Sequence, residues 1–223
     1  MDSMIQLENV KLSLTGGGGT VNILRGVDLQ AKRAETVSIV GPSGAGKTTL
    51  LMVMAGLERP DEGRVMIAGQ DLSPYGEQAL ARFRRKNLGI VFQSFHLIGT
   101  MTAWENVALP LEFAGETAAR EKAEEALAAV GLRERIAHYP AQLSGGEQQR
   151  VAIARAFVAH PALILADEPT GNLDVDTGDA VMKLLFRLQE QYGTTLILVT
   201  HDATLAHRCD RQLHMLDGKI ALP

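Results

Sequence analysis

Several features that would direct the interpretation of a sequence are scarce or missing here. The lone cysteine, Cys209, cannot form a disulfide within the chain. No apolar run approaches the length that spans a bilayer, and no signal segment opens the chain, so we expect a soluble, cytosolic protein. Positive charge is not in excess, since 22 Lys and Arg stand against 26 Asp and Glu, a net charge of −4. That balance argues against general attraction to nucleic acid or anionic lipid, so a role at a membrane requires a partner.

The chain is long enough for one well-buried domain, with 223 residues and 46% hydrophobic content, and too short for tandem copies. Apolar segments predict six strands, at residues 5–10, 36–40, 64–67, 88–92, 163–166 and 195–199. The continuous runs VSIV, LILA and LILV suit strands buried on both faces of a largely parallel sheet, with helices as crossovers. From about residue 94 to 160 no strand pattern appears, and residues 117–130 predict a helix capped by Gly131. We therefore predict an α/β core with an inserted helical subdomain.

A glycine-rich loop at residues 41–48 (GPSGAGKT) fits the pattern GxxxxGK[ST], in which bare backbone N–H groups cradle phosphates. It follows the strand pattern TVSIV and precedes the helical run TLLMVMAGL, which is the context that the pattern requires. Lys47 is expected to bridge β- and γ-phosphate oxygens, and Thr48 to bind Mg²⁺. An ordinary glycine-rich turn is the alternative, and it leaves this context unexplained. The residues expected to hold a nucleotide are Gly41, Pro42, Ser43, Gly44, Ala45, Gly46, Lys47, Thr48 and Thr49.

Polar residues follow three other expected strands, at the edge where open α/β sheets place their ligands. The run LILADEP delivers Asp167, expected to hold Mg²⁺, and Glu168, expected to polarise a water for attack on the γ-phosphate. A solvated acidic turn is the alternative, but two acids directly after a buried strand are hard to explain as solubility. His201 can hydrogen-bond the γ-phosphate, and Gln93 can sense Mg²⁺ and the attacking water. Taken alone, these two residues fit surface or strand-end positions better.

The run LSGGEQQR, at residues 143–150, offers a second phosphate-binding surface. Its serine, two glycines and glutamate, from Ser144 to Glu147, are expected to open a helix. A helix N-terminus with bare glycine amides is an anion site because its N–H groups and dipole both favour negative charge.

The order of these motifs resembles the nucleotide-binding subunit of ATP-binding cassette (ABC) transporters over essentially the whole chain, and LSGGE is the deciding element. In that family residues 41–48 match the Walker A loop, Gln93 the Q-loop, residues 143–147 the signature, and residues 171–174 the D-loop. The Walker B pair is Asp167 and Glu168, and the switch histidine is His201. The resemblance implies a P-loop NTPase (RecA-like) core at about residues 1–93 and 161–223. It also implies an antiparallel β subdomain near the N-terminus and a helical subdomain at about residues 94–160.

The same resemblance implies an ATPase that uses ATP and Mg²⁺. Its catalytic residues would be Glu168, His201, Gln93 and Lys47, and its Mg²⁺ ligands Thr48, Gln93 and Asp167. A signature far from the phosphate loop in one chain can reach a γ-phosphate only across a dimer, so two subunits are expected to sandwich two ATP molecules. The residues expected to act across that dimer are Ser144, Gly145, Gly146, Glu147 and Asp174.

Within the family, GIVFQSFHLIGTMTAWENVALPL and LADEPTGNLD resemble the lipoprotein-releasing (LolD-like) and macrolide-exporting ATPases, with the YbbA subgroup nearest. This implies integral-membrane permease partners, two per complex, and a place at the cytoplasmic face of the inner membrane, with no nucleic-acid partner. Two alternatives stay open. One is a regulatory ABC ATPase that gates an extracytoplasmic activity without transport; the other is a soluble ABC ATPase outside transport. Cargo contacts lie on another chain, so this sequence cannot choose the substrate.

One position departs from the family pattern, because Leu14 stands where many ABC proteins stack adenine on an aromatic residue. We therefore predict modest ATP affinity and poor discrimination of ATP from GTP. The glycine run at residues 16–19 is most simply a hairpin loop. A basic cluster at residues 82–86 is interpreted as a solvated helix face rather than a nucleic-acid or phospholipid surface.

Overall fold

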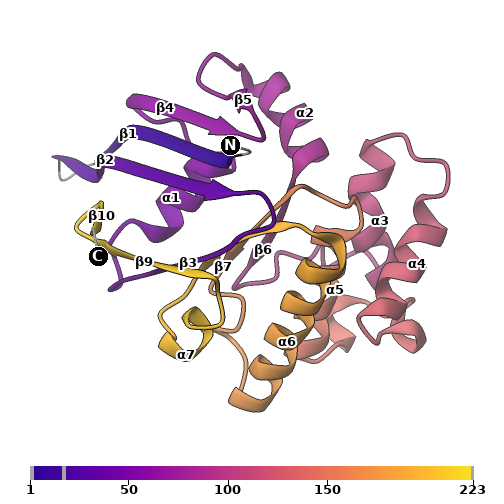
Figure 1. Ribbon diagram of the computed structural model, residues 1–223. Helices are drawn as coiled ribbons and strands as arrows, with labels where there is room; N and C mark the ends of the chain where they lie inside the picture. The colour runs from indigo at the N-terminus through magenta and orange to yellow at the C-terminus, as the bar shows by residue number, and fades with distance from the viewer. Residues whose placement is uncertain (1–2, 17–18, 222–223) are drawn as a thin grey trace. The chain divides into compact units, whose positions relative to one another are not determined.

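The computed structural model describes residues 3–16 and 19–221 of the chain (Figure 1). Its contacts divide the chain into two compact units: Met1–Arg84 with Thr195–Pro223, called unit 1 here, and Arg85–Thr194, called unit 2. The expected boundaries of the core and the helical subdomain stay predictions. Among the described helices, none is both long and apolar enough to cross a membrane.

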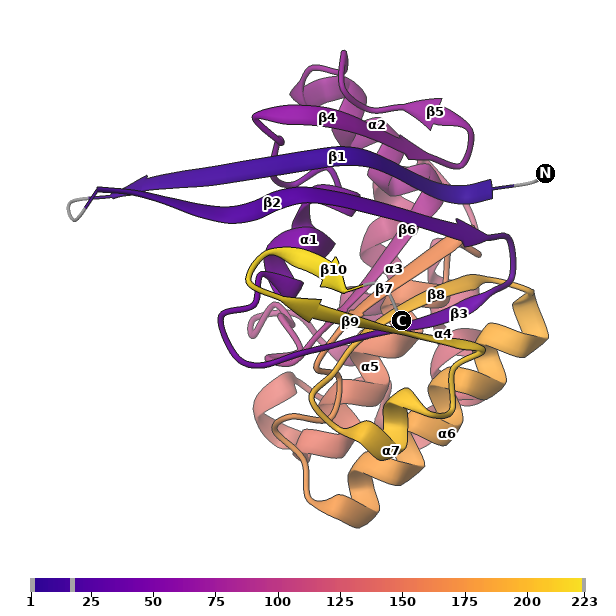
Figure 2. The same cartoon turned by 60° about the vertical axis from the view of Figure 1, so that its left-hand side comes forward.

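Unit 1 begins with an antiparallel sheet in the order β2-β1-β4-β5. Its strands are β1 (Ser3–Gly16), β2 (Gly19–Lys32), β4 (Glu62–Ile67) and β5 (Gln70–Asp71). Figure 2 shows β1 and β2 side by side as a long hairpin, and their register pairs Leu14 with Val21 and Gly16 with Gly19. This sheet confirms the antiparallel subdomain. The hairpin agrees with the expected loop at residues 16–19, although residues 17 and 18 lie outside the described part of the chain.

The remaining strands of unit 1 are β3 (Thr36–Val40), β8 (Thr195–Val199), β9 (Arg211–Leu216) and β10 (Lys219–Ala221). β3 runs parallel to both β8 and β9, and β10 is antiparallel to β9. Every residue of β3 and β8 is buried, as the apolar runs TVSIV and TLILV predict for strands covered on both faces. Helices α1 (Lys47–Met54) and α7 (Ala203–Ala206) also belong to this unit.

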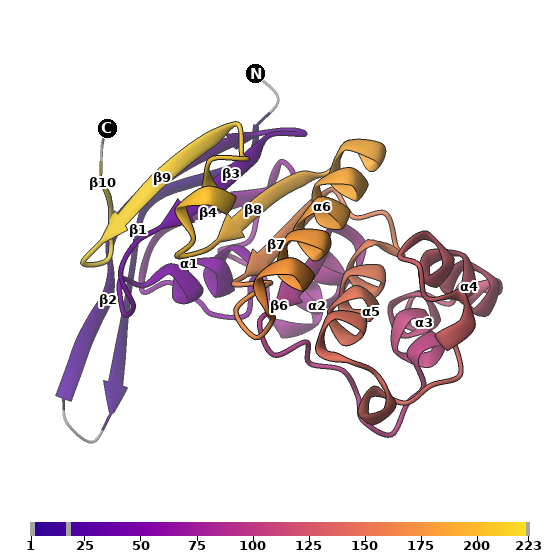
Figure 3. The same ribbon diagram turned by 90° about the horizontal axis from the view of Figure 1, so that it is seen from below.

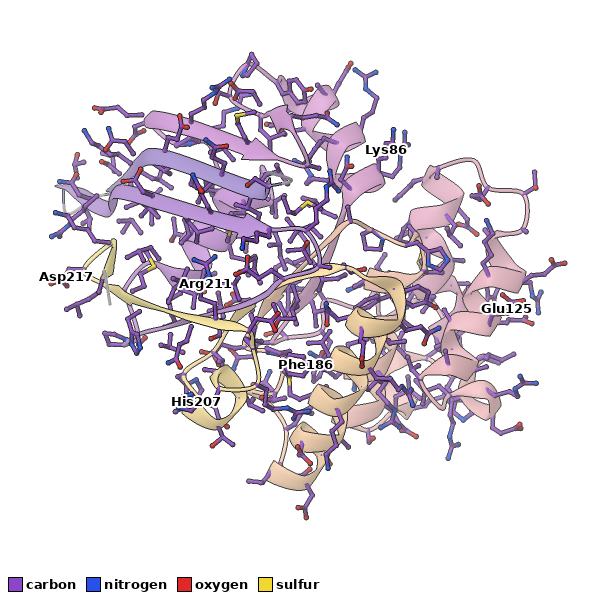
Figure 4. The ribbon with its side chains drawn as sticks, in the orientation of Figure 1. Lys86, Glu125, Phe186, His207, Arg211 and Asp217 are labelled. Atoms are coloured by element: carbon purple, nitrogen blue, oxygen red, sulfur yellow. The ribbon has the colours of Figure 1, made fainter. Side chains whose placement is uncertain are left out.

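Helix α2 (Glu77–Asn87) spans the division between the units and carries the basic cluster. Arg82, Arg85 and Lys86 are exposed on it, and Figure 4 labels Lys86. Arg84 is half-buried and donates from its guanidinium to the carbonyl oxygen of Gly56 at 2.7 Å.

Unit 2 contains the parallel pair β6 (Leu88–Phe92) and β7 (Leu163–Asp167). The described chain between them forms helices joined by turns and no strand, which confirms the predicted insertion. These helices are α3 (Ala103–Phe113), α4 (Ala119–Ala129), two 3₁₀ turns at Arg133–Arg135 and Pro140–Gln142, and α5 (Gly145–Phe157). Helix α6 (Val175–Tyr192) follows β7, and Figure 3 shows it beside α5. The predicted cap of α4 is confirmed, since Gly131 has φ 75° and the N–H groups of Gly131 and Leu132 bond back to Ala128 and Leu127.

Candidate functional site

The predicted site residues lie in both units. In unit 1 the glycine-rich loop leaves the C-terminal end of β3 and enters α1. Gly44 and Gly46 have φ values of 79° and 98°, a region that residues with a Cβ rarely adopt. A Cβ at Gly41 would lie 2.1 Å from the carbonyl oxygen of Met215 in β9, so the loop begins where only glycine fits. Backbone N–H groups at the start of α1 have no partner within the helix, which is the property that binds phosphate.

Lys47 is the first residue of α1 and is only 9% exposed. Its Nζ donates to the carbonyl oxygens of Gly41 and Pro42, at 2.8 and 3.0 Å. The ammonium group is therefore held inside the curve of its own loop. A buried ammonium group held by carbonyl oxygens is well placed to exchange them for the stronger acceptors of a phosphate.

His201 follows β8 and is exposed. Because β3 and β8 are parallel and paired from Thr36 to Ile39, their C-terminal ends lie at the same edge, where the backbone N–H of Thr200 donates to the carbonyl of Ile39. Within unit 1, the structure thus places His201 and the phosphate loop at one edge of the strands, where open α/β sheets bind their ligands.

In unit 2 the pair β6 and β7 delivers the other polar residues. Phe92 lies opposite Asp167 in the register, so Gln93 leaves β6 beside the point where Asp167 and Glu168 leave β7. Asp167 is 9% exposed and Glu168 half-buried. Glu168 has φ 46°, a strained value for a residue with a side chain, and its carbonyl closes a turn by accepting from the N–H of Gly171 at 3.0 Å.

Gln93 is exposed and forms a reciprocal amide pair with Asn172. Its Nε2 donates to Oδ1 of Asn172 at 3.2 Å, and Nδ2 of Asn172 donates to the carbonyl oxygen of Gln93 at 3.0 Å. The segment after β6 is thereby joined to the segment after β7.

Ser144 caps the N-terminus of α5, as the LSGGE pattern predicts. Its Oγ accepts from the N–H of Glu147 at 3.3 Å, and the carboxylate of Glu147 accepts from the N–H of Ser144 at 2.8 Å. The Ser144 N–H holds the pKa of Glu147 below its usual range. Because Oγ accepts from the chain, its own proton remains available to a donor role toward an anion. Glu147 completes the cap, so it would contribute to a nucleotide site indirectly, by holding Ser144 in position.

Asp174 has a similar local function at the start of α6. Its carboxylate accepts from the N–H of Thr177 at 3.0 Å, and this bond lowers the pKa of Asp174. The side chain is exposed, and Val175 beside it is 87% exposed.

The sequence pattern of the ABC transporter family matches residues 24–171. The chain belongs to this family. It is 50% identical over 221 residues to the ATP-binding protein YbbA of Escherichia coli K12, covering 98% of this chain and 97% of that protein. It is 46% identical over 224 residues to the lipoprotein-releasing system ATP-binding protein LolD of Shewanella oneidensis, and the match covers 100% of this chain and 97% of that protein. The dimeric ATP-binding cassette MJ0796, bound to ADP and Pi, superposes with a TM-score of 0.90 at 42% identity. The match covers 98% of this chain and 97% of that chain.

The similarity to this cassette structure confirms the P-loop NTPase fold that the resemblance implied. Sequence reasoning nevertheless missed two polar residues that touch the site segments, Gln149 and Asn172. Arg155 of α5 donates to the carbonyl oxygens of Phe95 and His96 at 2.8 and 2.7 Å, and burial lowers its pKa. Phe95 and His96 have φ values of 58° and 48°. Gln149, Asn172 and Arg155 all donate to backbone carbonyls, which no residue pattern reveals.

Proposed function

We propose that this chain is the ATP-binding and ATP-hydrolysing subunit of an ABC transporter that powers a membrane permease. The observation that carries the proposal is the combination, in one member of this family, of a phosphate loop with a buried lysine and a signature helix whose serine caps its N-terminus. The near full-length similarity to a cassette bound to ADP and Pi supports ATP as the substrate.

The phosphate loop would bind ATP through the backbone N–H groups around Gly44, Gly46 and Lys47. Lys47 would transfer its hydrogen bonds from Gly41 and Pro42 to the β- and γ-phosphates. Because the ammonium group already lies within the loop, little rearrangement is needed, which favours the bound state.

The residues proposed for Mg²⁺ fit the ion by their chemistry, since the Thr48 hydroxyl, the Gln93 amide oxygen and the Asp167 carboxylate are the hard oxygen ligands that it prefers. When bound, Mg²⁺ neutralises charge on the phosphate oxygens. Glu168 would accept a hydrogen bond from the attacking water, and His201 and Gln93 would help to orient that water and the γ-phosphate.

The ABC dimer would bring the signature of one subunit to the ATP held by the other. Ser144 would donate a hydrogen bond from its hydroxyl to the phosphate, and Gly145 and Gly146 would present bare amides at the helix N-terminus. Glu147 and Asp174 would hold these helix ends in shape through their caps. The dimeric state of the structural relative supports this arrangement.

The proposed partners are two integral-membrane permease subunits at the cytoplasmic face of the inner membrane, of the lipoprotein-release or hydrophobic-compound export type. The similarity to the lipoprotein-releasing system protein LolD supports this class of partner. We propose to test it by affinity purification of the Glu168→Gln variant with ATP from detergent-solubilised membranes, with mass spectrometry of what co-purifies. A permease supports the proposal, whereas only soluble, ribosomal or DNA-associated partners would favour a non-transport ABC ATPase.

Two substitutions test the hydrolysis itself. Lys47→Ala should lower both ATP binding and turnover, because it removes the phosphate clamp, whereas Glu168→Gln should keep ATP binding and lower kcat by about a hundredfold or more. Phosphate release and nucleotide binding are measured on both, with Lys86→Ala, an exposed lysine of α2, as the control that should behave as wild type. Wild-type turnover in Glu168→Gln would refute the role of Glu168.

A further inference from the structure

Gln149 is a completely buried polar residue in α5, four residues after the helix begins, with 0% of its surface exposed. Its Nε2 donates to the carbonyl oxygen of Pro169 at 2.6 Å and to that of Phe92 at 3.4 Å. An amide NH₂ group has two hydrogens, so one nitrogen can serve both acceptors. This side chain therefore joins three segments: α5, the end of β6 and the turn after β7.

The two carbonyls that Gln149 binds flank the residues proposed for hydrolysis. Phe92 immediately precedes Gln93, and Pro169 immediately follows Glu168. The turn that carries Glu168 is strained at φ 46° and is closed by the bond from Gly171 N–H to the Glu168 carbonyl. Proline has no N–H, so the hydrogen bonding of Pro169 with the rest of the chain depends on its carbonyl.

The side-chain oxygen of Gln149 indicates that core packing alone does not account for a glutamine at this position. Its Oε1 is buried and has no hydrogen-bond partner within the described part of the chain. An unpaired buried carbonyl oxygen costs stability, and an apolar side chain of the same shape would avoid that cost. Strained backbone also persists only where surrounding contacts hold it, and functional sites are where such strain concentrates.

We propose that Gln149 is a positioning residue for ATP hydrolysis, whose amide holds the Glu168 turn at a set distance from the Gln93 segment and from the signature helix. The inference rests on the proposed function, because it assigns to Gln149 the placement of the carboxylate that polarises water. Gln149 acts through Glu168 and has no contact of its own with the nucleotide. A small displacement of a catalytic group is enough to lower turnover strongly.

The first test is Gln149→Met, which keeps the length of the side chain and removes both donated bonds. We expect kcat for ATP to fall by about tenfold or more, and KM to change by less than about twofold, because the phosphate loop is untouched. Gln149→Asn is the second variant: it keeps an amide, is shorter by one methylene and cannot reach both carbonyls, so the same kcat loss is expected. The assays use the purified chain together with any permease that co-purifies with it.

Gln189→Met is the matched control. Gln189 is also buried, at 8% exposure, and its Nε2 also donates to a backbone carbonyl, that of Thr194 at 2.8 Å, but this bond lies in the turn after α6. This control should lower the melting temperature while leaving kcat within about twofold of wild type. If kcat fell in both Gln149→Met and Gln189→Met in proportion to the drop in melting temperature, the proposal would be overturned.

Two further measurements separate positioning from general damage. In a Glu168→Gln background, Gln149→Met should add less than about a twofold further loss, since residues that act as a unit are not additive. Gln149→Met should also retain ATP-dependent dimerisation, as is expected of Glu168→Gln, because only the hydrolytic step is impaired. Full additivity, or a lost dimer, would overturn the inference. If the wild type did not hydrolyse ATP, both the proposed function and this inference would be overturned. If the wild type hydrolysed ATP and Gln149→Met had the same kcat, only this inference would be overturned.

Discussion

Gly146 has a packing role within the chain that is separate from any contact with a nucleotide. A Cβ at Gly146 would lie 2.3 Å from Cγ2 of Thr177 in α6, far inside normal contact distance. Thr177 is a short β-branched side chain and cannot swing away as a long flexible one would. The start of the signature helix therefore approaches α6 as closely as it does only because residue 146 lacks a side chain.

Gly146→Ala is accordingly expected to lower the free energy of unfolding by about 1–3 kcal/mol, by overpacking against Thr177. Adding Thr177→Ser removes Cγ2 and should restore most of the loss, as measured by thermal or urea denaturation. ATP turnover of the restored double variant then reports on the nucleotide role of Gly146 alone. A double variant that remains as unstable as Gly146→Ala would contradict the packing argument.

Leu14 is the second residue with a specific consequence. It is 48% exposed on β1 and lies opposite Val21, which is 57% exposed on β2. If adenine stacks at this position as in the family, an aliphatic surface gives less stacking than a ring, by about 1 kcal/mol. We expect wild type to bind ATP and GTP with similar, modest affinity, and Leu14→Tyr to bind ATP about fivefold more tightly. Fluorescence titration with both nucleotides measures this, and tight, selective ATP binding by wild type would refute it.

Among the helices, α3 and α5 both begin with a capping box. Thr102 and Glu105 form a capping box on α3, as Ser144 and Glu147 do on α5. The Thr102 hydroxyl and backbone N–H both donate to the Glu105 carboxylate and lower its pKa below the ordinary 4.5. The S/T-x-x-E spacing in the sequence is the signal for both boxes.

The lowered pKa of Glu105 makes this cap pH-dependent in a defined direction. A carboxyl group whose pKa is lower in the folded than in the unfolded state stabilises the fold fully when the pH is above its unfolded-state pKa, near 4.5. This stabilisation is lost as the pH falls through its folded-state pKa. The difference in melting temperature between wild type and Glu105→Gln should therefore be full at neutral pH and vanish in strong acid. Glu112→Gln, on the same helix outside the cap, is the control and should follow wild type throughout. A difference that persisted unchanged in acid would contradict the assignment.

For the whole molecule, the central expectation is an ATP-dependent dimer. Val175 is 87% exposed beside Asp174, one of the residues predicted to act across that dimer. Burial of this apolar side chain between two subunits would remove its surface from water, which favours association. We expect Glu168→Gln to dimerise on adding ATP, and Val175→Lys in that background to remain monomeric.

Light scattering after size-exclusion chromatography measures these states. Phe113→Lys is the matched control, because Phe113 is likewise apolar and 66% exposed but lies at the end of α3. It should leave the ATP-dependent dimer intact. A dimer unaffected by Val175→Lys would place the interface elsewhere.

The elements and residues that the sequence predicted are those whose signal is local. Continuous apolar runs mark β3, β7 and β8 because both faces of those strands are buried, and the phosphate loop and the acidic pair are read directly from residue types. By contrast, β2 was missed, and β1 was predicted only for residues 5–10, because their buried positions are spaced among polar residues and interrupted by register shifts. β9 and β10 were missed as well, since their residues are largely exposed or half-buried.

Residue patterns alone were enough to predict the family, the order of the phosphate-binding segments and the chemical type of each candidate site residue. The folded chain shows which residues hold these segments in place: Gln149 donates to the carbonyls of Phe92 and Pro169, and Thr177 packs against Gly146. The physical reason is that motif chemistry and backbone preference are properties of neighbouring residues. Hydrogen bonds to distant carbonyls and close packing arise only when the folded chain brings segments together.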